Sequence, residues 1–156
     1  MGNKNSSQIA ICIWSKIDIP VIYDLVVQLA IYEKGPEAVI TTMEDYYVAY
    51  DNGIISGHIA RLETGEVIGM TLFYEGFSTW KGKMLYLEDF FVLEKYRKLG
   101  IGKLLFEAYI DEAKSRNVSL LKWQVLDWNE LAIRFYEKYD VQILTDWWTC
   151  RKLLKK

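Results

Sequence analysis

The chain has 156 residues, which fits a single domain, and its hydrophobic fraction of 51% is enough for a packed core without disulfides or a metal. That fraction, with a net charge of only -2, excludes a disordered chain. The 19 Lys and Arg residues are balanced by 21 Asp and Glu residues, so no basic excess is present to bind nucleic acid by bulk electrostatics.

The first fifty residues predict one strand followed by two helices. The apolar run at 9–15 is typical of a strand. Apolar residues recur at helical spacing over 21–33, with Asp18 as a candidate N-cap and Pro20 in the first turn. Residues 42–50 predict a second, shorter helix.

The middle of the chain predicts a hairpin and a long central strand. Residues 55–63 and 66–75 flank the dipeptide Thr64-Gly65, which is typical of two antiparallel strands joined by a turn. The run at 84–93 is dense in aliphatic and aromatic residues, as expected of a strand buried within a sheet.

A helical pattern follows Gly102 and continues to about residue 116. From the spacing we expect its buried face to consist mainly of Leu104, Leu105, Ala108 and Ala113.

The last part of the chain predicts a strand at 120–126, a short helix at 129–139 and a final strand at 141–153. The element order is then β-α-α-β-β-β-α-β-α-β, a mixed α/β layer fold. We expect one domain over residues 1–156, with residues 1–8 flexible because they are polar.

Metal, membrane and secretion signals are weak in this sequence. Cys12 and Cys150 lie near opposite ends and His58 is the single histidine, so we expect no zinc or other metal site. No secretory signal or membrane-spanning run is visible, which predicts a cytoplasmic protein without a membrane or nucleic-acid partner.

The most informative local motif is Arg97-x-x-Gly100-x-Gly102, between a predicted strand and a predicted helix. Glycines allow a tight turn, and the amides of the following helix end can bind a phosphate or pyrophosphate. An ordinary strand-to-helix turn explains the same residues equally well. The Walker motif and the dinucleotide-binding fingerprint are both absent.

This motif, together with Phe135-Tyr136, resembles the GNAT superfamily of acetyl-CoA-dependent N-acetyltransferases. Residues 29–33, 80–92 and 128–130 are similar to the diamine (spermidine/spermine) acetyltransferases, and the resemblance runs from about residue 9 to 153. It implies a mixed, mostly antiparallel central sheet flanked by helices. It also implies transfer of an acetyl group from acetyl-CoA to a primary amine, and a homodimer.

The resemblance assigns the cofactor to the central strand and the glycine turn. The strand would pair its backbone with the pantetheine arm, and the Val92 N–H would polarise the acetyl carbonyl. Asn129 would contact the cofactor arm, although it is also an ordinary N-cap. The full set of implied cofactor-binding residues is Phe90, Phe91, Val92, Arg97, Lys98, Leu99, Gly100, Ile101, Gly102, Lys103 and Asn129.

Two residues are candidates for moving protons. Tyr136 matches the tyrosine that protonates the departing thiolate in the family, although a helix tyrosine packed on a sheet is the plainer explanation. We expect Glu88 to accept the amine proton, directly or through water. Neighbouring strand residues point to opposite faces, so Glu88 and Asp89 are not expected to form a carboxylate pair, and Asp89 can be structural.

The amine site is implied by Tyr32 and Glu33, with Trp80 and Asp89 as further substrate-binding candidates, because aromatic faces and carboxylates suit a cation. Ser78 stands where the diamine enzymes carry an acidic residue, so a smaller, amino-acid-like amine becomes credible beside a polyamine or diamine. Two alternatives remain open: a non-catalytic acyl-CoA-binding regulatory module, and a transferase acting on a peptide or protein amine.

Overall fold

The structure, a computed structural model, describes residues 8–154, and these residues divide into two compact units, the first ending at Gln124 and the second beginning at Val125. The predicted flexible segment, apart from Gln8, lies outside the described residues. The single domain expected from the sequence stays a prediction.

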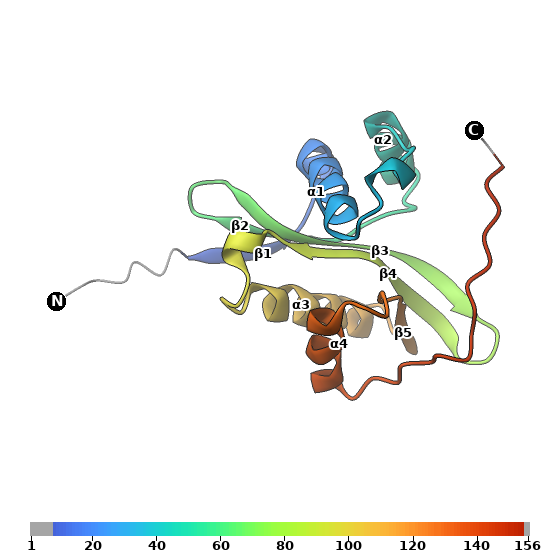
Figure 1. Cartoon of the computed structure of the whole chain (residues 1–156). Coiled ribbons are helices and arrows are strands. Elements are labelled where there is room, and N and C mark those ends of the chain that lie inside the picture. Colours follow the sequence, from blue (N-terminus) through green and yellow to red (C-terminus); the bar gives the residue numbers. More distant parts are fainter. Residues whose placement is uncertain (1–7, 155–156) are drawn as a thin grey trace. The chain divides into compact units, whose positions relative to one another are not determined.

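The first unit is built on a five-stranded sheet (Figure 1). Its strands are β1 (Ile9–Ile13), β2 (His58–Leu62), β3 (Val67–Ser78), β4 (Gly82–Val92) and β5 (Leu120–Trp123), in the order β1-β2-β3-β4-β5. Each pair from β1 to β4 is antiparallel, whereas β5 runs parallel to β4. The predicted mixed, mostly antiparallel sheet is therefore confirmed.

Helices cover both faces of this sheet. Figure 1 shows α1 (Ile19–Tyr32) and α2 (Met43–Asp51) on one face and α3 (Ile101–Ser115) on the other. Short 3-10 turns at 16–18, 36–38 and 94–96 join these elements. Two apolar clusters correspond to the two faces: α1 packs on Met70 and Leu72 of β3, and α3 packs on Ala60 and Ile68.

Local sequence signals explain where these elements start and turn. The Thr42 side chain accepts a hydrogen bond from the Asp45 N–H, and the Asp45 carboxylate accepts one from the Thr42 N–H, a capping box that begins α2. Pro20 lies in the first turn of α1, as predicted. The hairpin between β2 and β3 turns at Gly65, whose φ of 90° disfavours a side chain.

The buried face of α3 differs in part from the predicted face. It consists of Ile101, Leu105, Phe106, Tyr109 and Ala113. Leu104 is 43% exposed and Ala108 is only half-buried, so these two assignments were wrong. The buried face is centred on Phe106 and Tyr109 instead of on Leu104 and Ala108. The Tyr109 hydroxyl donates a 2.6 Å hydrogen bond to the Leu85 carbonyl inside the sheet, which keeps this side of the helix inward.

This correction can be tested with two adjacent leucines. Leu105→Ala should lower the free energy of unfolding by about 2–5 kcal/mol, because it leaves a cavity under the sheet where Leu105 is fully buried. Leu104→Ala, the matched control, should change it by no more than about 0.5 kcal/mol. Urea unfolding of both variants measures the difference. Equal losses of unfolding free energy would contradict the observed buried face of α3.

The second unit contains α4 (Glu130–Tyr136) and a 3-10 turn at 137–139. The helix begins at Asn129, whose side chain accepts a 3.2 Å hydrogen bond from the Ala132 N–H, so its capping role is confirmed. The predicted strand at 141–153 is wrong, because these residues form neither helix nor strand. A strand requires a neighbouring backbone to pair with, and among the described residues no strand ladder includes this segment.

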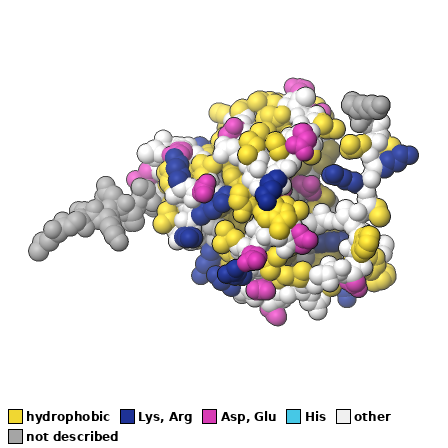
Figure 2. Space-filling view, in the orientation of Figure 1, with side chains coloured by type: hydrophobic (Ala, Val, Ile, Leu, Met, Phe, Trp, Pro, Cys, Tyr) yellow, Lys and Arg dark blue, Asp and Glu magenta, His cyan; other side chains and the backbone are white. Residues whose placement is uncertain are grey.

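The surface carries mixed charges. In the space-filling view, Lys and Arg side chains are interspersed with Asp, Glu and apolar side chains over the visible face (Figure 2). None of the helices within residues 8–154 is both long and apolar enough to cross a membrane.

Candidate active site

A β-bulge interrupts the middle of β4. Leu72 of β3 is paired with Asp89, but the next residue, Phe73, is paired with Leu87. Glu88 is the extra residue between these two pairs, so β4 has one residue more than β3 over this stretch of the ladder. The usual alternation of side chains is therefore broken at the two adjacent carboxylates.

The bulge brings both carboxylates to the face covered by α1 and α2. Asp89 is paired with Leu72, which packs in the cluster beneath α1. The charge of Glu88 acts on Tyr74 and Tyr86, whose rings stack on each other with centroids 5.2 Å apart, and on Tyr46 of α2. The prediction that Glu88 and Asp89 point to opposite faces was wrong, because it assumed a regular strand.

A third carboxylate joins this pair. Burial, together with the negative charges of Glu88 and Glu33, raises the pKa of Asp89 to about 7. Glu33 directly follows the last residue of α1, and loss of hydration raises its own pKa. We call Glu33, Glu88 and Asp89 the acidic cluster.

Tyrosine side chains surround the acidic cluster. Burial, with a further contribution from the charge of Asp89, raises the pKa of Tyr46 to about 12. Burial, the charge of Glu88 and the hydrogen bond between Glu88 and Tyr74 together raise the pKa of Tyr74 to about 12. Phenols with raised pKa values stay neutral at physiological pH, so aromatic faces and hydroxyl donors lie beside negative charge. Such a site suits a cation.

The edge of β4 opposite β3 opens at the same place. Parallel pairing with β5 ends at Leu87 and Trp123, one residue before the bulge. Among the described residues, no strand pairs with 88–92 on that side. The Leu93 N–H donates to the Ile68 carbonyl at 2.9 Å, so the N–H and C=O of Val92, one residue earlier, point toward the open edge.

The predicted glycine turn follows the open edge. Gly100 has a φ of 83° and precedes α3, and a Cβ there would meet open space. Lys98 also has a positive φ, of 64°. Successive amides in such a turn, followed by the amides at a helix N-terminus, form a concave site for an anion. The turn therefore fits the diphosphate of a nucleotide-containing cofactor.

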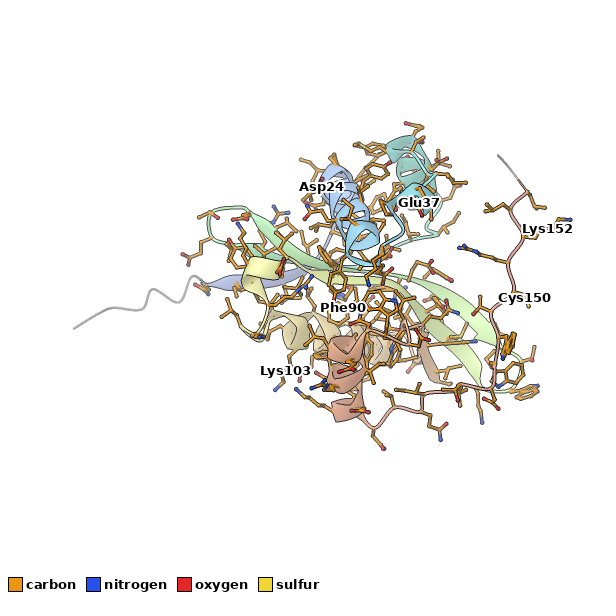
Figure 3. All side chains as sticks on the ribbon, viewed as in Figure 1. Asp24, Glu37, Phe90, Lys103, Cys150 and Lys152 are labelled. Atoms are coloured by element: carbon orange, nitrogen blue, oxygen red, sulfur yellow. The ribbon has the colours of Figure 1, made fainter. Side chains whose placement is uncertain are left out.

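The side chains of the turn are distributed unevenly. Ile101 is buried and anchors the helix, whereas Leu99 is 64% exposed. Lys103 lies on α3 with an exposed amine 3.7 Å from Glu107 (Figure 3). Arg97 is half-buried and bends back to β4, where its Nε donates a 3.0 Å hydrogen bond to the Val92 carbonyl.

The side chains of Phe90 and Phe91 pack on opposite faces of the sheet, Phe91 in the buried core and Phe90 partly buried against the α3 cluster. Phe90, labelled in Figure 3, stacks on Phe106 of α3 with centroids 5.9 Å apart. Phe91 faces the opposite side and is 7% exposed. Backbone groups alternate along a strand, so the N–H and C=O of Phe90, like those of Val92, point toward the open edge, whereas those of Phe91 face β3.

Trp80 is not brought to the acidic cluster. It lies in the turn between β3 and β4 and is 81% exposed. Gly82 and Glu88 are six positions apart along the strand, which corresponds to about 20 Å. Its role in substrate binding stays a prediction without support from the geometry.

Tyr136 and Asn129 belong to the second unit. Tyr136 is 7% exposed and its ring meets that of Phe135 edge-on, with centroids 5.5 Å apart. The catalytic role of Tyr136 and the cofactor contact of Asn129 stay predictions.

Sequence reasoning missed the bulge and three tyrosines, Tyr46, Tyr74 and Tyr86. One signal was present, because two adjacent carboxylates in an apolar strand are costly to bury and so mark an unusual local arrangement. The tyrosines carried no signal, since two of them alternate with apolar residues as in any strand. Within residues 8–154, no group of three or more His, Cys, Asp or Glu side chains is arranged to hold a metal ion.

Comparisons with known proteins agree with this geometry. The acetyltransferase (GNAT) family model matches residues 21–140. The chain is 35% identical over 127 residues to a thialysine N-epsilon-acetyltransferase of Caenorhabditis elegans, covering 80% of this chain and 79% of the relative. It is 40% identical over 86 residues to the L-ornithine N5-acetyltransferase NATA1 of Arabidopsis thaliana, covering 54% of this chain but only 38% of the relative.

The fold is similar to that of a solved aminoglycoside acetyltransferase from an uncultured soil metagenomic sample. The TM-score is 0.76 at 18% identity, over 92% of this chain and 97% of the other. At this identity the likeness concerns the fold alone.

Proposed function

The chain belongs to the acetyltransferase (GNAT) family and is an acetyl-CoA-dependent N-acetyltransferase, and from this premise we propose that its acceptor is the terminal amine of a small diamine, polyamine or basic amino acid. The observation that carries the acceptor class is the acidic cluster among neutral tyrosines on the α1 and α2 face of β4. A protonated alkylamine is the small cation that such a site binds most readily.

The open edge of β4 and the glycine turn are the proposed cofactor site. Acetyl-CoA supplies an acetyl group activated as a thioester. The backbone of 88–92 pairs with the pantetheine arm in the manner of an added strand, and the amides after Arg97 hold the diphosphate. The Val92 N–H, which points toward the open edge, donates to the acetyl oxygen as negative charge develops there.

The acidic cluster is the proposed proton acceptor and amine site. An alkylammonium has no lone pair, so its proton must leave before the nitrogen attacks. Glu88 is exposed and takes this proton directly or through water, while the half-buried Asp89 holds the amine close. Tyr136 donates a proton to the departing thiolate.

The acceptor class also draws support from the relatives. Two of them are a thialysine N-epsilon-acetyltransferase and an L-ornithine N5-acetyltransferase, names that place the acetylated amine at the epsilon and N5 nitrogens. Both nitrogens are terminal amines of a flexible chain, which agrees with carboxylates and aromatic rings lining the site. The distal part of such a substrate would meet Tyr32 and Glu33 at the end of α1.

A thiol-release assay tests the proposal. Purified protein with acetyl-CoA should release coenzyme A when given diamines, polyamines, ornithine, or lysine and its thioether analogue, and the acetylated product should appear by mass spectrometry. Acetyl-CoA without amine is the control. Coenzyme A binding without turnover of any of these amines would favour a regulatory module instead, and turnover of peptides alone would favour a protein acetyltransferase.

The rate should depend on pH through Asp89. Because its pKa is raised to about 7, Asp89 is neutral below that pH, and kcat/KM should fall about tenfold per pH unit well below 7. Asp89→Asn should be slower but should lose this acidic limb, whereas Asp111→Asn, an exposed control on α3, should keep it. An acidic limb that survives in Asp89→Asn would contradict the assignment.

The raised pKa of Asp89 should also make stability depend on pH, but in the opposite direction to kcat/KM: stability should decrease as the pH rises. The folded state binds the Asp89 proton more tightly than the unfolded chain, so the free energy of unfolding should fall as pH rises from about 4 to about 7. This contribution should be absent from Asp89→Asn, and urea unfolding at pH 5 and pH 8 measures it.

The homodimer and the cytoplasmic location expected from the sequence are also proposals. Supporting an interface, Trp147 and Trp148 are 69% and 89% exposed in a segment without regular secondary structure.

A further inference from the structure

The side chain of Arg97 makes three contacts that the glycine motif does not explain. Its Nε donates a 3.0 Å hydrogen bond to the Val92 carbonyl. Its guanidinium carbon lies 4.6 Å from the centre of the Tyr32 ring and 5.4 Å from the centre of the Phe91 ring. The half-buried guanidinium therefore touches both α1 and β4.

The contact with Val92 occurs at the end of the open edge. The Val92 carbonyl points away from β3, because the next N–H, that of Leu93, donates to Ile68 of β3. Arg97 donates its hydrogen bond to this outward-facing carbonyl. The N–H of Val92, which points toward the same edge, remains available to a ligand. The hydrogen bond thus fixes the orientation of the peptide groups on either side of Val92.

The contact with Tyr32 occurs at the end of α1. Tyr32 is the last residue of that helix, and the next residue, Glu33, acts through its charge on Asp89. A shift of Tyr32 would therefore move a member of the acidic cluster. A planar guanidinium can donate at its edge and stack on rings with its face at the same time, which a lysine ammonium cannot do.

We propose that Arg97 is a positioning residue, which clamps the end of α1 to the open edge of β4 and so sets the separation between amine and acyl donor. This inference rests on the proposed function and goes beyond it, because it couples two sites that touch different substrates. A direct contact of the Arg97 side chain with the diphosphate is the competing role.

Binding of coenzyme A separates these two roles without requiring turnover. The clamp predicts that Tyr32→Leu, a change in the amine site, weakens coenzyme A binding about tenfold by calorimetry, and Tyr32→Phe, which keeps the ring, does not. Arg97→Lys should weaken binding similarly, and Tyr32→Leu should have little further effect in that background. If Arg97 instead contacts the diphosphate, Tyr32→Leu leaves the affinity unchanged and the two changes are additive.

Kinetics at saturating acetyl-CoA supply the second readout. The clamp predicts that Arg97→Lys lowers kcat/KM for the amine about tenfold, whereas a diphosphate contact predicts no change under that condition. Lys95→Gln, which removes an exposed charge from the same connection, is the control, and thermal midpoints verify that each variant is folded.

The wild-type protein distinguishes the two failures. Wild-type protein that binds coenzyme A but acetylates none of the amines would contradict the proposed function. The coenzyme A affinities of the single and double variants of Arg97 and Tyr32 would still test whether Arg97 acts as a clamp. Additive effects of Arg97→Lys and Tyr32→Leu on binding in an active enzyme would overturn the clamp alone.

Discussion

Replacing Val92 with proline should lower kcat by about 10²–10³-fold, the loss typical of removing one oxyanion donor. Proline lacks an N–H, and the Val92 N–H points to the open edge of β4, away from β3. The ladder between β3 and β4 therefore keeps its hydrogen bonds, and the carbonyl that accepts from Arg97 is retained. Steady-state kinetics at saturating acetyl-CoA measure the effect.

The control for this change is Val92→Ala, which keeps the N–H and removes only packing against α3. It should retain kcat within a few-fold and lose about 1 kcal/mol of unfolding free energy. A folded Val92→Pro enzyme with the kcat of Val92→Ala would show that this N–H does not stabilise the developing charge. The thermal midpoint of each variant decides whether the comparison is valid.

Replacing Tyr136 with phenylalanine should lower kcat by about 10²–10⁴-fold, since it removes the proposed donor to the departing thiolate. The affinity for coenzyme A should stay within about threefold, because the proposed cofactor contacts lie in the backbone of β4 and of the glycine turn. Calorimetry and thiol-release kinetics on the same preparation measure both quantities.

Tyr139→Phe is the matched control, because it makes the same change three residues later in the same unit. It should leave turnover within a few-fold of the wild type. Equal losses in both variants would indicate a packing role for tyrosines in this unit, and an active Tyr136→Phe enzyme would remove Tyr136 from the mechanism.

The local elements of the first unit were predictable because each is encoded over a few residues. Helical spacing and the cap residue Asp18 located α1, the helical pattern at 42–50 located α2, and the Thr64-Gly65 turn located the hairpin. The glycine turn before α3 has the positive φ at Gly100 that its sequence suggested. The chemistry of these residues alone selects their backbone conformation.

The predicted final strand shows the limit of this local information. The composition of a segment can favour a strand, but a strand also requires a partner backbone elsewhere. The described structure has no ladder that includes residues 141–154, so the pattern alone was insufficient.

By itself, the sequence determined the individual strands and helices of the first unit and the glycine turn, because periodicity and turn chemistry act between near neighbours, whereas the mixed sheet was implied only by the family resemblance. Only the tertiary structure decided that Glu88 and Asp89 share a face, since the bulge depends on the register between β3 and β4. It alone also placed Arg97 between Tyr32 and Val92, residues that are 60 positions apart and meet only when α1 packs on the sheet. Register and packing are properties of the whole fold, and for that reason no short motif carries them.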